Sequence, residues 1–275
     1  MKNISSKLYM DVLFQKQKLP GDRKGPRRAL TDEWISAATG VFLALFMWTH
    51  MLFVGSILTG QRGFDFVSNV LETTWLAQLI VILVTVAFFV HFVTASRKIP
   101  GKLSERRRMM ELGRTVKGAR KRWNQDPRSE IRHRDHSETS LWIWQVRTGM
   151  IILAIGSIHL FVVVADIWQR TFGGAGITAS ESMARVQDGM WILYAVLLFC
   201  VELHAGIGLY RVAVKWGVGS RIPFTGKRMT RQMAHRSERI VLWFFTIIGI
   251  VTLLVLAGVL APPLALLLPE SGGSF

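Results

Sequence analysis

Apolar residues in this chain gather into five long segments, each separated from the next by a polar stretch. A helix rises about 1.5 Å per residue, so about 20 apolar residues are needed to cross a hydrocarbon layer of about 30 Å. The pattern predicts five spanning helices, over residues 34–58, 75–96, 141–168, 189–214 and 240–260. The expected fold is therefore an all-α membrane protein with five transmembrane helices.

Basic residues are concentrated in three of the polar stretches. Of the 34 Lys and Arg residues, 30 lie in residues 1–33, 97–137 and 211–239. Because cytoplasmic connections carry an excess of Lys and Arg, this asymmetry places the N-terminus in the cytoplasm and the C-terminus outside. It also explains the net charge of +16 without a nucleic-acid partner. The basic residues of the 97–137 connection either serve only to orient the chain in the membrane or also form a docking surface for a cytoplasmic subunit.

This topology divides the chain into three parts: a cytoplasmic segment (1–33), a transmembrane domain (34–260) and an external tail (261–275). The stretch Lys7–Leu19 can form an interfacial helix with one lipid-facing side. A single cysteine, Cys200, excludes an internal disulfide. No internal repeat is evident.

Four histidines lie deep within the first four apolar segments, one in each: His50, His91, His159 and His204. Ionisable side chains are costly at such depth and usually face the interior of a helix bundle, where they mark functional sites. The other three histidines lie in basic cytoplasmic stretches and are not expected to be ligands.

Depth along the predicted helices sorts these four histidines into two pairs. His50 and His159 both lie about 24–27 Å from the cytoplasmic ends of their helices, and His91 and His204 lie about 22–24 Å from the outer ends. The two pairs are separated by roughly 15 Å along the membrane normal. A haem iron without an open position takes two axial ligands from opposite faces. The spacing therefore predicts an outer haem b held by one pair, an inner haem b held by the other, and a four-helix bundle around both.

The alternative is that each histidine only forms a hydrogen bond to a neighbouring helix. Matching in depth across four helices argues against that alternative. Small residues near the ligands, on the same helices, would also let a flat macrocycle approach the backbone; they are Ala87, Ala95, Gly156, Gly206 and Gly208.

Haem propionates are anionic and require cations near the membrane surfaces. Arg97, Lys98, Arg211 and Lys215 follow the inner ligands along their helices, and Arg185 precedes the fourth helix on the outer side. For each of them, snorkelling toward lipid phosphate is an open alternative.

Two acidic residues lie close to the predicted haem sites. Glu202 is two residues before His204 and, at about 200° of helix rotation, faces away from the ligand ring. A buried carboxyl favours its neutral form, which suits transient proton uptake, although a structural hydrogen bond is an alternative. Glu72 precedes the second predicted helix at its outer end. It is either an acid stabilised by the helix dipole or a proton acceptor for a quinol near the outer haem. Asp166 is expected at the membrane interface.

The run Val201–Gly217 contains Glu202, His204 and Lys215, and it resembles the haem-ligand helix of dihaem cytochrome b subunits. The family is that of quinol:fumarate reductases with a single large membrane anchor. The resemblance extends over the five spans, the order of the four ligands and the basic cytoplasmic connections.

This resemblance implies an electron-transfer subunit that anchors a flavoprotein and an iron–sulfur protein on the cytoplasmic side. Menaquinol would be its substrate, with Glu72 accepting the proton and Glu202 linked to transmembrane proton transfer. Lys98, Arg185 and Lys215 would bind propionates, and Trp142 is a further residue that the resemblance brings to this role. A dimer of such heterotrimers is compatible with the family pattern.

Three alternatives stay open at this point. The same anchor can work in the opposite direction, as a succinate dehydrogenase that reduces quinone. A dihaem anchor of a formate dehydrogenase or hydrogenase uses the same kind of ligands, and a haem-free anchor or transporter uses the histidines as polar contacts only.

Overall fold

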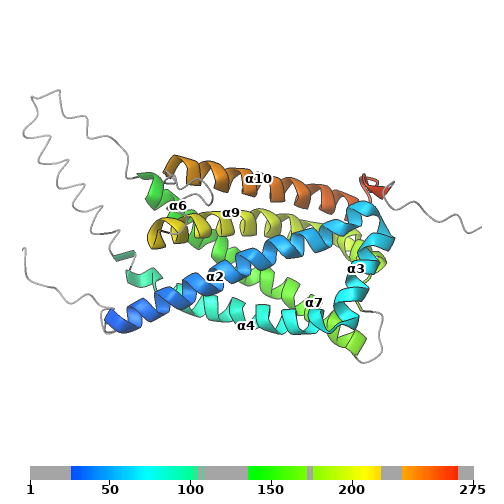
Figure 1. Cartoon of the computed structure of the whole chain (residues 1–275), viewed down its shortest axis with the longest axis horizontal. Coiled ribbons are helices and arrows are strands. Elements are labelled where there is room, and N and C mark those ends of the chain that lie inside the picture. The colour runs from blue at the N-terminus through cyan, green and yellow to red at the C-terminus, as the bar shows by residue number, and fades with distance from the viewer. Residues whose placement is uncertain are drawn as a thin grey trace, which may run out of the picture. The chain divides into compact units, whose positions relative to one another are not determined.

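The computed structural model describes residues 26–101, 103–104, 107, 136–171, 176–217 and 231–265. Within these residues all regular structure is helical (Figure 1). Five of the helical segments are long and apolar enough to cross a membrane, which confirms the predicted all-α membrane fold. The predicted interfacial helix at Lys7–Leu19, most of the 97–137 connection and most of the 261–275 tail lie outside the described residues.

The helices follow one another along the chain in a simple order. They are α2 (Pro26–Val54), α3 (Gln61–Thr73), α4 (Leu76–Ser96), α6 (His136–Ile151), α7 (Ser157–Thr171), α8 (Ala179–Arg185), α9 (Trp191–Trp216) and α10 (Arg231–Leu256). A 3-10 turn, η1 (Gly55–Thr59), follows α2, and two π turns, η2 (Ile152–Gly156) and η3 (Val186–Met190), join α6 to α7 and α8 to α9.

The ends of several predicted spans differ from the observed helices, and both α2 and α10 begin earlier than expected, at Pro26 and Arg231. The fourth span was expected to begin at Gly189, but helical structure already begins at Ala179, and Gly189 is a non-helical kink inside it. Its apolar pattern begins only after the kink, because α8 is a short polar helix. The fifth span was expected to reach residue 260, but α10 ends at Leu256 in a turn in which the Gly258 amide donates to the Val255 carbonyl at 3.0 Å.

Helix α3 was not predicted, because its sequence is too polar to resemble a membrane span. It runs across the ends of the long helices rather than along them (Figure 1). Phe64 is buried on one side of α3, and Trp75 turns the chain from α3 into α4 with a left-handed backbone (φ 60°) that is uncommon for an aromatic residue.

The chain divides into two compact units. One comprises residues 1–35 and 93–130; in its described part, Arg97 pairs with Asp32 at 3.4 Å and Lys98 pairs with Glu33 at 3.7 Å. The other comprises residues 36–92 and 131–275 and contains all four deep histidines.

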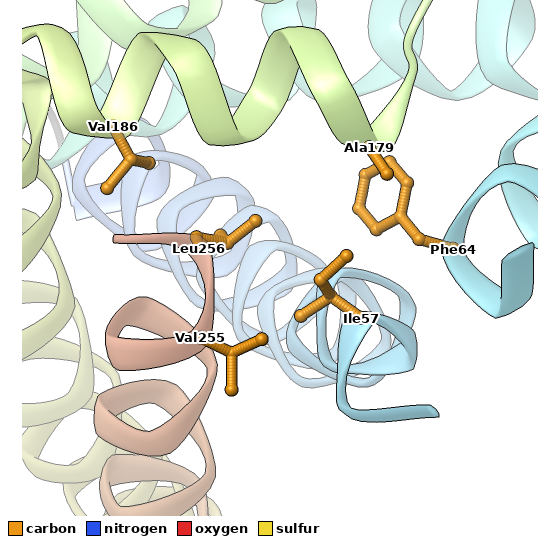
Figure 2. Packing of buried hydrophobic residues seen from close by; sticks show 6 residues of the cluster. All are labelled: Ile57, Phe64, Ala179, Val186, Val255 and Leu256. Atoms are coloured by element: carbon orange, nitrogen blue, oxygen red, sulfur yellow. The ribbon is translucent and has the colours of Figure 1, made fainter. Parts of the chain in front are cut away.

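In this second unit, α9 packs against α10 and α6, while a compact apolar cluster joins η1, α3, α8, η3 and α10 (Figure 2). The cluster residues are Ile57, Phe64, Ala179, Val186, Val255 and Leu256. Burying such side chains contributes about 1.5–3 kcal/mol for each large one. The cluster therefore fixes α3 and α8 against the ends of the spanning helices.

Large apolar side chains cover the outward surface of the spans. On α4, for example, Leu79, Ile82 and Val86 are all about half exposed. In water such a surface would be unfavourable, but in a bilayer it faces lipid. The exposed surface thus agrees with a multi-pass membrane protein.

Candidate functional site

The structure brings His50 of α2 beside His159 of α7. Their ring centroids are 6.0 Å apart and the ring planes are inclined by 56°. Phe46 stacks on His50 at 5.5 Å, and Tyr194 of α9 meets His159 edge-on at 5.4 Å. The two histidines that sequence depth paired as the outer ligands are therefore neighbours in space.

The second pair is arranged in the same way. His91 of α4 lies beside His204 of α9, with ring centroids 6.2 Å apart and ring planes at 87°. Each pair thus joins two different helices, and the four helices α2, α4, α7 and α9 contribute one ring each.

The ring separations fit a haem iron between each pair. A metal–imidazole nitrogen bond is about 2 Å long, and the ring centroid lies about 1 Å behind that nitrogen, so two rings on opposite faces of one ion have centroids about 6 Å apart. Both observed separations agree with this value.

The helices of each histidine pair are separated by more than direct backbone packing. The backbones of α2 and α7 do not pack closely along their length, and neither do those of α4 and α9. The histidine rings of each pair meet across this wider separation. A macrocycle between the rings would supply the missing packing.

Hydrogen bonds select the nitrogen that the second pair offers to a metal. His91 Nδ1 lies 3.0 Å from the Ser36 carbonyl oxygen, and His204 Nδ1 lies 2.9 Å from the Gln145 carbonyl oxygen. A carbonyl oxygen only accepts, so in these bonds Nδ1 carries the proton and Nε2 keeps its lone pair. This is the usual arrangement around a metal-ligating histidine.

The hydrogen bonding of His159 differs from that of the second pair. Its Nδ1 is buried and has no hydrogen-bond partner among the described residues. An unsatisfied buried polar atom costs about 1–3 kcal/mol, so the surroundings of His159 differ from those of His91 and His204, whose Nδ1 atoms are both hydrogen-bonded.

The ligand chemistry points to a haem rather than to a bare ion. Among the described residues, no three His, Cys, Asp or Glu side chains gather as they would around a metal ion. Two imidazoles are sufficient for haem iron, because the porphyrin supplies four further nitrogen donors.

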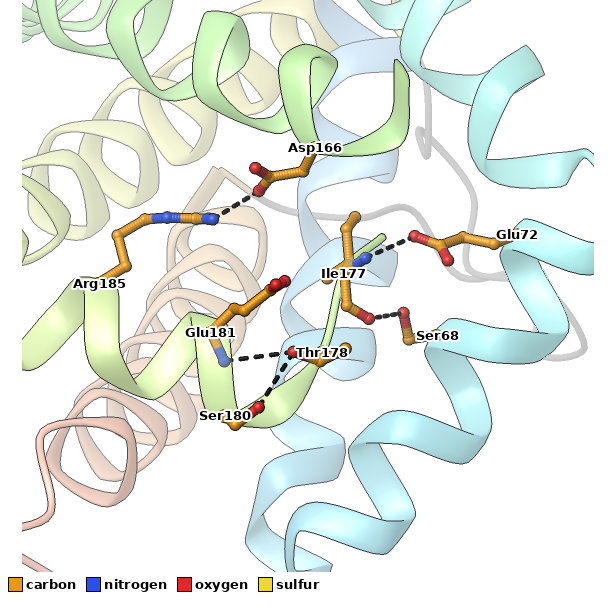
Figure 3. A network of polar contacts seen from close by, with 8 residues as sticks. All are labelled: Ser68, Glu72, Asp166, Ile177, Thr178, Ser180, Glu181 and Arg185. Carbon is orange, nitrogen blue, oxygen red and sulfur yellow. Dashed lines mark hydrogen bonds and ion pairs between the residues drawn. The ribbon is translucent and has the colours of Figure 1, made fainter. Parts of the chain in front are cut away.

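The predicted propionate partners have varied surroundings. Arg185 donates to Asp166 at 2.6 Å and also hydrogen-bonds Tyr194 (Figure 3 shows the pair with Asp166). Lys215 lies over the Trp216 ring at 5.6 Å. Trp142 is half-buried on α6.

Lys98, the fourth predicted propionate partner, belongs to the other unit, where it pairs with Glu33.

Glu202 is buried on α9, and its Oε1 has no hydrogen-bond partner within the described chain.

Glu72 is one of three polar side chains of α3 that bind the backbone at the start of α8; Figure 3 shows two of them, Glu72 and Ser68. The Ile177 amide donates to Glu72 Oε1 at 2.8 Å, and Ser68 Oγ donates to the Ile177 carbonyl at 2.5 Å. One turn earlier on α3, Asp65 Oδ1 accepts from the Ala179 amide at 2.6 Å. These three side chains follow helical spacing, so one face of α3 binds the backbone at the start of α8.

This position corrects the dipole interpretation of Glu72. The residue was expected at the N-terminal end of the second span, where a helix dipole stabilises an acid. It lies instead near the C-terminal end of α3, where the dipole disfavours a negative charge. Its partner is a backbone amide from another part of the chain.

Aromatic contacts connect α3 to the first histidine pair. Phe64 of α3 lies 5.3 Å from Phe53, and Phe53 lies 6.2 Å from His50. Glu72 is therefore on the helix that adjoins the His50/His159 end of the bundle, not the His91/His204 end.

Comparison with known proteins decides the family. The model of the family described as succinate dehydrogenase/fumarate reductase transmembrane subunit matches residues 124–235. The chain is 32% identical over 244 residues to the fumarate reductase cytochrome b subunit of Wolinella succinogenes, covering 84% of this chain and 83% of that protein. It is 33% identical over 212 residues to the protein of the same name from Helicobacter pylori strain 26695, covering 72% of each. This chain belongs to the fumarate reductase cytochrome b subunits.

Membership confirms the resemblance read from Val201–Gly217. As a fumarate reductase cytochrome b subunit, the chain is a membrane-anchor component of an oxidoreductase complex. The family covers both fumarate reductases and succinate dehydrogenases, so membership alone leaves the direction of turnover open.

Sequence reasoning about this cytochrome b subunit missed the polar residues that act between helices. Asp166 was expected at the membrane interface, which stays a prediction, but its ion pair with Arg185 was not foreseen. Asp65 and Ser68 were not singled out at all. Their spacing with Glu72 was readable in the sequence, but α3 itself was not expected.

The Asp166–Arg185 pair gives a prediction for stability. We expect Asp166→Asn to destabilise the assembled subunit by about 1–3 kcal/mol, because the half-buried Arg185 loses its charged acceptor. Thermal denaturation of the purified complex measures the effect.

The exposed Glu181 supplies the matched control, and Glu181→Gln should leave the melting temperature unchanged. Adding Arg185→Gln to Asp166→Asn should cost little more than either change alone. Fully additive losses would mean that the two side chains do not stabilise each other.

Proposed function

We propose that this chain is the quinol-oxidising cytochrome b subunit of a fumarate reductase complex, with two haem b groups and a cytoplasmic iron–sulfur partner. The observation that carries the proposal is the pair of bridging histidine contacts, at 6.0 and 6.2 Å, in a chain of this family. His50 with His159, and His91 with His204, would hold one haem each. When bound, these groups would carry single electrons from menaquinol toward the iron–sulfur protein.

The asymmetry of basic residues supports the orientation of the subunit in the bacterial inner membrane. In this orientation residues 1–33 are cytoplasmic, residues 34–260 form the dihaem transmembrane domain, and residues 261–275 are external. The His91/His204 pair is then the inner one, near the iron–sulfur and flavoprotein subunits. The His50/His159 pair is the outer one.

Glu72 accepts a proton when quinol is oxidised at the outer end of the bundle. Its carboxylate is buried on α3, and α3 reaches His50 through Phe53 and Phe64. A carboxylate withdrawn from water is suited to receive a proton from a substrate hydroxyl, and the Ile177 amide holds the Glu72 side chain in position.

Glu202 serves a second proton-transfer role inside the membrane. Its side chain is buried in an apolar helix. Because burying a carboxyl there is energetically costly, its presence favours a functional role. Lys98, Arg185, Lys215 and Trp142 are proposed propionate partners, of which Arg185 must share its guanidinium with Asp166.

The same parts can run in reverse as a succinate dehydrogenase that reduces quinone. The names of the Wolinella and Helicobacter relatives favour fumarate reduction. Family membership also favours a dicarboxylate enzyme over a formate dehydrogenase or hydrogenase.

Purification of the complex through a tag on this chain tests the proposal. We expect a flavoprotein and an iron–sulfur protein to copurify, and the complex to oxidise a menaquinol analogue with fumarate as acceptor. Copurification with a molybdenum or nickel enzyme, or absence of quinol:fumarate activity in an intact complex, would contradict the proposed function.

A further inference from the structure

The ring of His91 rests in a small recess on α2. Its Nδ1 is 3.0 Å from the Ser36 carbonyl oxygen and 3.2 Å from Thr39 Oγ1. The next residue, Gly40, faces the edge of the ring, and a Cβ at this position would lie only 2.9 Å from His91 Cε1. Real Cβ contacts essentially never become so short, so any side chain here would displace the ring.

The ring of His204 rests in an equivalent recess on α6. Its Nδ1 is 2.9 Å from the Gln145 carbonyl oxygen and 3.4 Å from Thr148 Oγ1. A Cβ at Gly149 would lie 2.8 Å from His204 Cε1. The same three elements therefore meet both rings: a backbone carbonyl, a threonine hydroxyl three residues later, and a glycine directly after the threonine.

The two recesses also have the same place relative to the other histidine pair. Gly40 precedes His50 by ten residues, and Gly149 precedes His159 by ten residues. On α2 this spacing corresponds to about 15 Å of helix rise. Each Thr-Gly pair thus lies on a chain segment that supplies a ligand to one haem site, but it contacts a ligand of the other site.

We propose that Thr39-Gly40 and Thr148-Gly149 are matched positioning pairs that fix the rotation and depth of the His91 and His204 rings toward the haem between them. The inference rests on the proposed haem binding. The glycines admit the ring edges, while the carbonyls and threonines accept from Nδ1 and direct Nε2 away from the recess.

The threonine hydroxyls have an additional electronic effect. A stronger acceptor at Nδ1–H makes an imidazole a more basic ligand, and a more basic ligand favours ferric over ferrous iron. Loss of the hydroxyl should therefore raise the midpoint potential of that haem.

The glycines are tested by Gly40→Ala and Gly149→Ala in the purified complex. We expect each variant to lose, or to shift in its low-spin ferric EPR signal, the same single haem that disappears in His204→Ala. The EPR signal is informative because it depends on the angle between the two axial ring planes. The other haem should keep its spectrum, although Gly40 lies on the helix that carries His50.

Gly55→Ala is the matched control, because a Cβ there meets only ordinary contacts, at 3.6 Å from Ile248 and 3.7 Å from Thr252. It should leave both haems unchanged. Unchanged signals in Gly40→Ala and Gly149→Ala would overturn the proposal, and so would equal disturbance of both haems. Fewer than two haems in the unmodified subunit would instead refute the proposed function.

If the alanine variants do not assemble, valine variants of the two threonines test the proposal instead. Thr39→Val and Thr148→Val should each raise the midpoint potential of the His91/His204 haem in a redox titration, and Thr39→Ser should restore it. An unchanged potential in both valine variants, or a shift in the other haem, would contradict the proposal.

Discussion

Replacing either His50 or His159 by alanine should remove one and the same b haem from the assembled complex. The two rings lie on different helices and meet at 6.0 Å, so each is expected to supply half of one axial ligand set. An iron that loses one of two imidazoles loses both affinity and its low-spin spectrum. The remaining haem, between His91 and His204, should keep its spectrum.

The assignment of the histidines to pairs makes a sharper prediction for double variants than for single ones. The double variant of His50 and His159 should lose no more haem than either single variant, because the residues act as one unit. A double variant of His50 and His91 should lose both haems. Pyridine haemochrome quantification and reduced-minus-oxidised difference spectra of the purified complex provide the measurement.

His235→Ala serves as the control, since this histidine lies at the start of α10 and belongs to neither pair. It should retain both haems. If His50→Ala and His159→Ala removed different haems, or if their losses added up, the assignment of ligand pairs would be wrong.

Glu72→Gln should reduce menaquinol:fumarate turnover by about 10²–10⁴-fold while leaving fumarate reduction by an artificial electron donor intact. The amide oxygen of glutamine can still accept from the Ile177 amide, so the contact between α3 and this segment is kept. What the substitution removes is the ability to take up a proton. The measurement compares the two donor activities in the same preparation.

Asp65→Asn is the matched control for this change. Asp65 lies on the same face of α3 and also accepts from a backbone amide, that of Ala179 at 2.6 Å. Its amide variant should retain quinol-linked turnover. Unchanged turnover in Glu72→Gln would remove Glu72 from the mechanism, and equal losses in both variants would assign it a structural role only.

The spans and the pairing of histidines could be predicted from sequence because both depend on one-dimensional quantities. Apolar length reports a membrane crossing, and helix rise converts position into depth. His50 and His159 therefore emerge at matching depth before any contact is known. Helix ends were predicted less well, since the kink at Gly189 and the turn at Gly258 depend on local backbone geometry.

The surroundings of the rings could not be predicted in this way. Sequence reasoning looked for small residues beside each histidine on its own helix, such as Gly156 and Gly206. The glycines that touch the His91 and His204 rings are Gly40 and Gly149, which lie on neighbouring helices. Which helix faces which, and with what rotation, is decided by packing rather than by sequence spacing.

The polar contacts of α3 show the same limit. Glu72 was singled out for its chemistry, but its hydrogen-bond partner is more than one hundred residues away in the chain. A short amphipathic helix lying across the bundle leaves no long apolar run in the sequence. Neither α3 nor its hydrogen bonds to the backbone at the start of α8 were therefore expected.

The haem content of the unmodified subunit tests the central claim most directly. Pyridine haemochrome quantification of the purified complex, referred to the amount of this chain, should give two b haems per chain. Their reduced-minus-oxidised spectrum should show the features of low-spin iron with two imidazole ligands. One haem or none per chain in an intact, active complex would contradict the account.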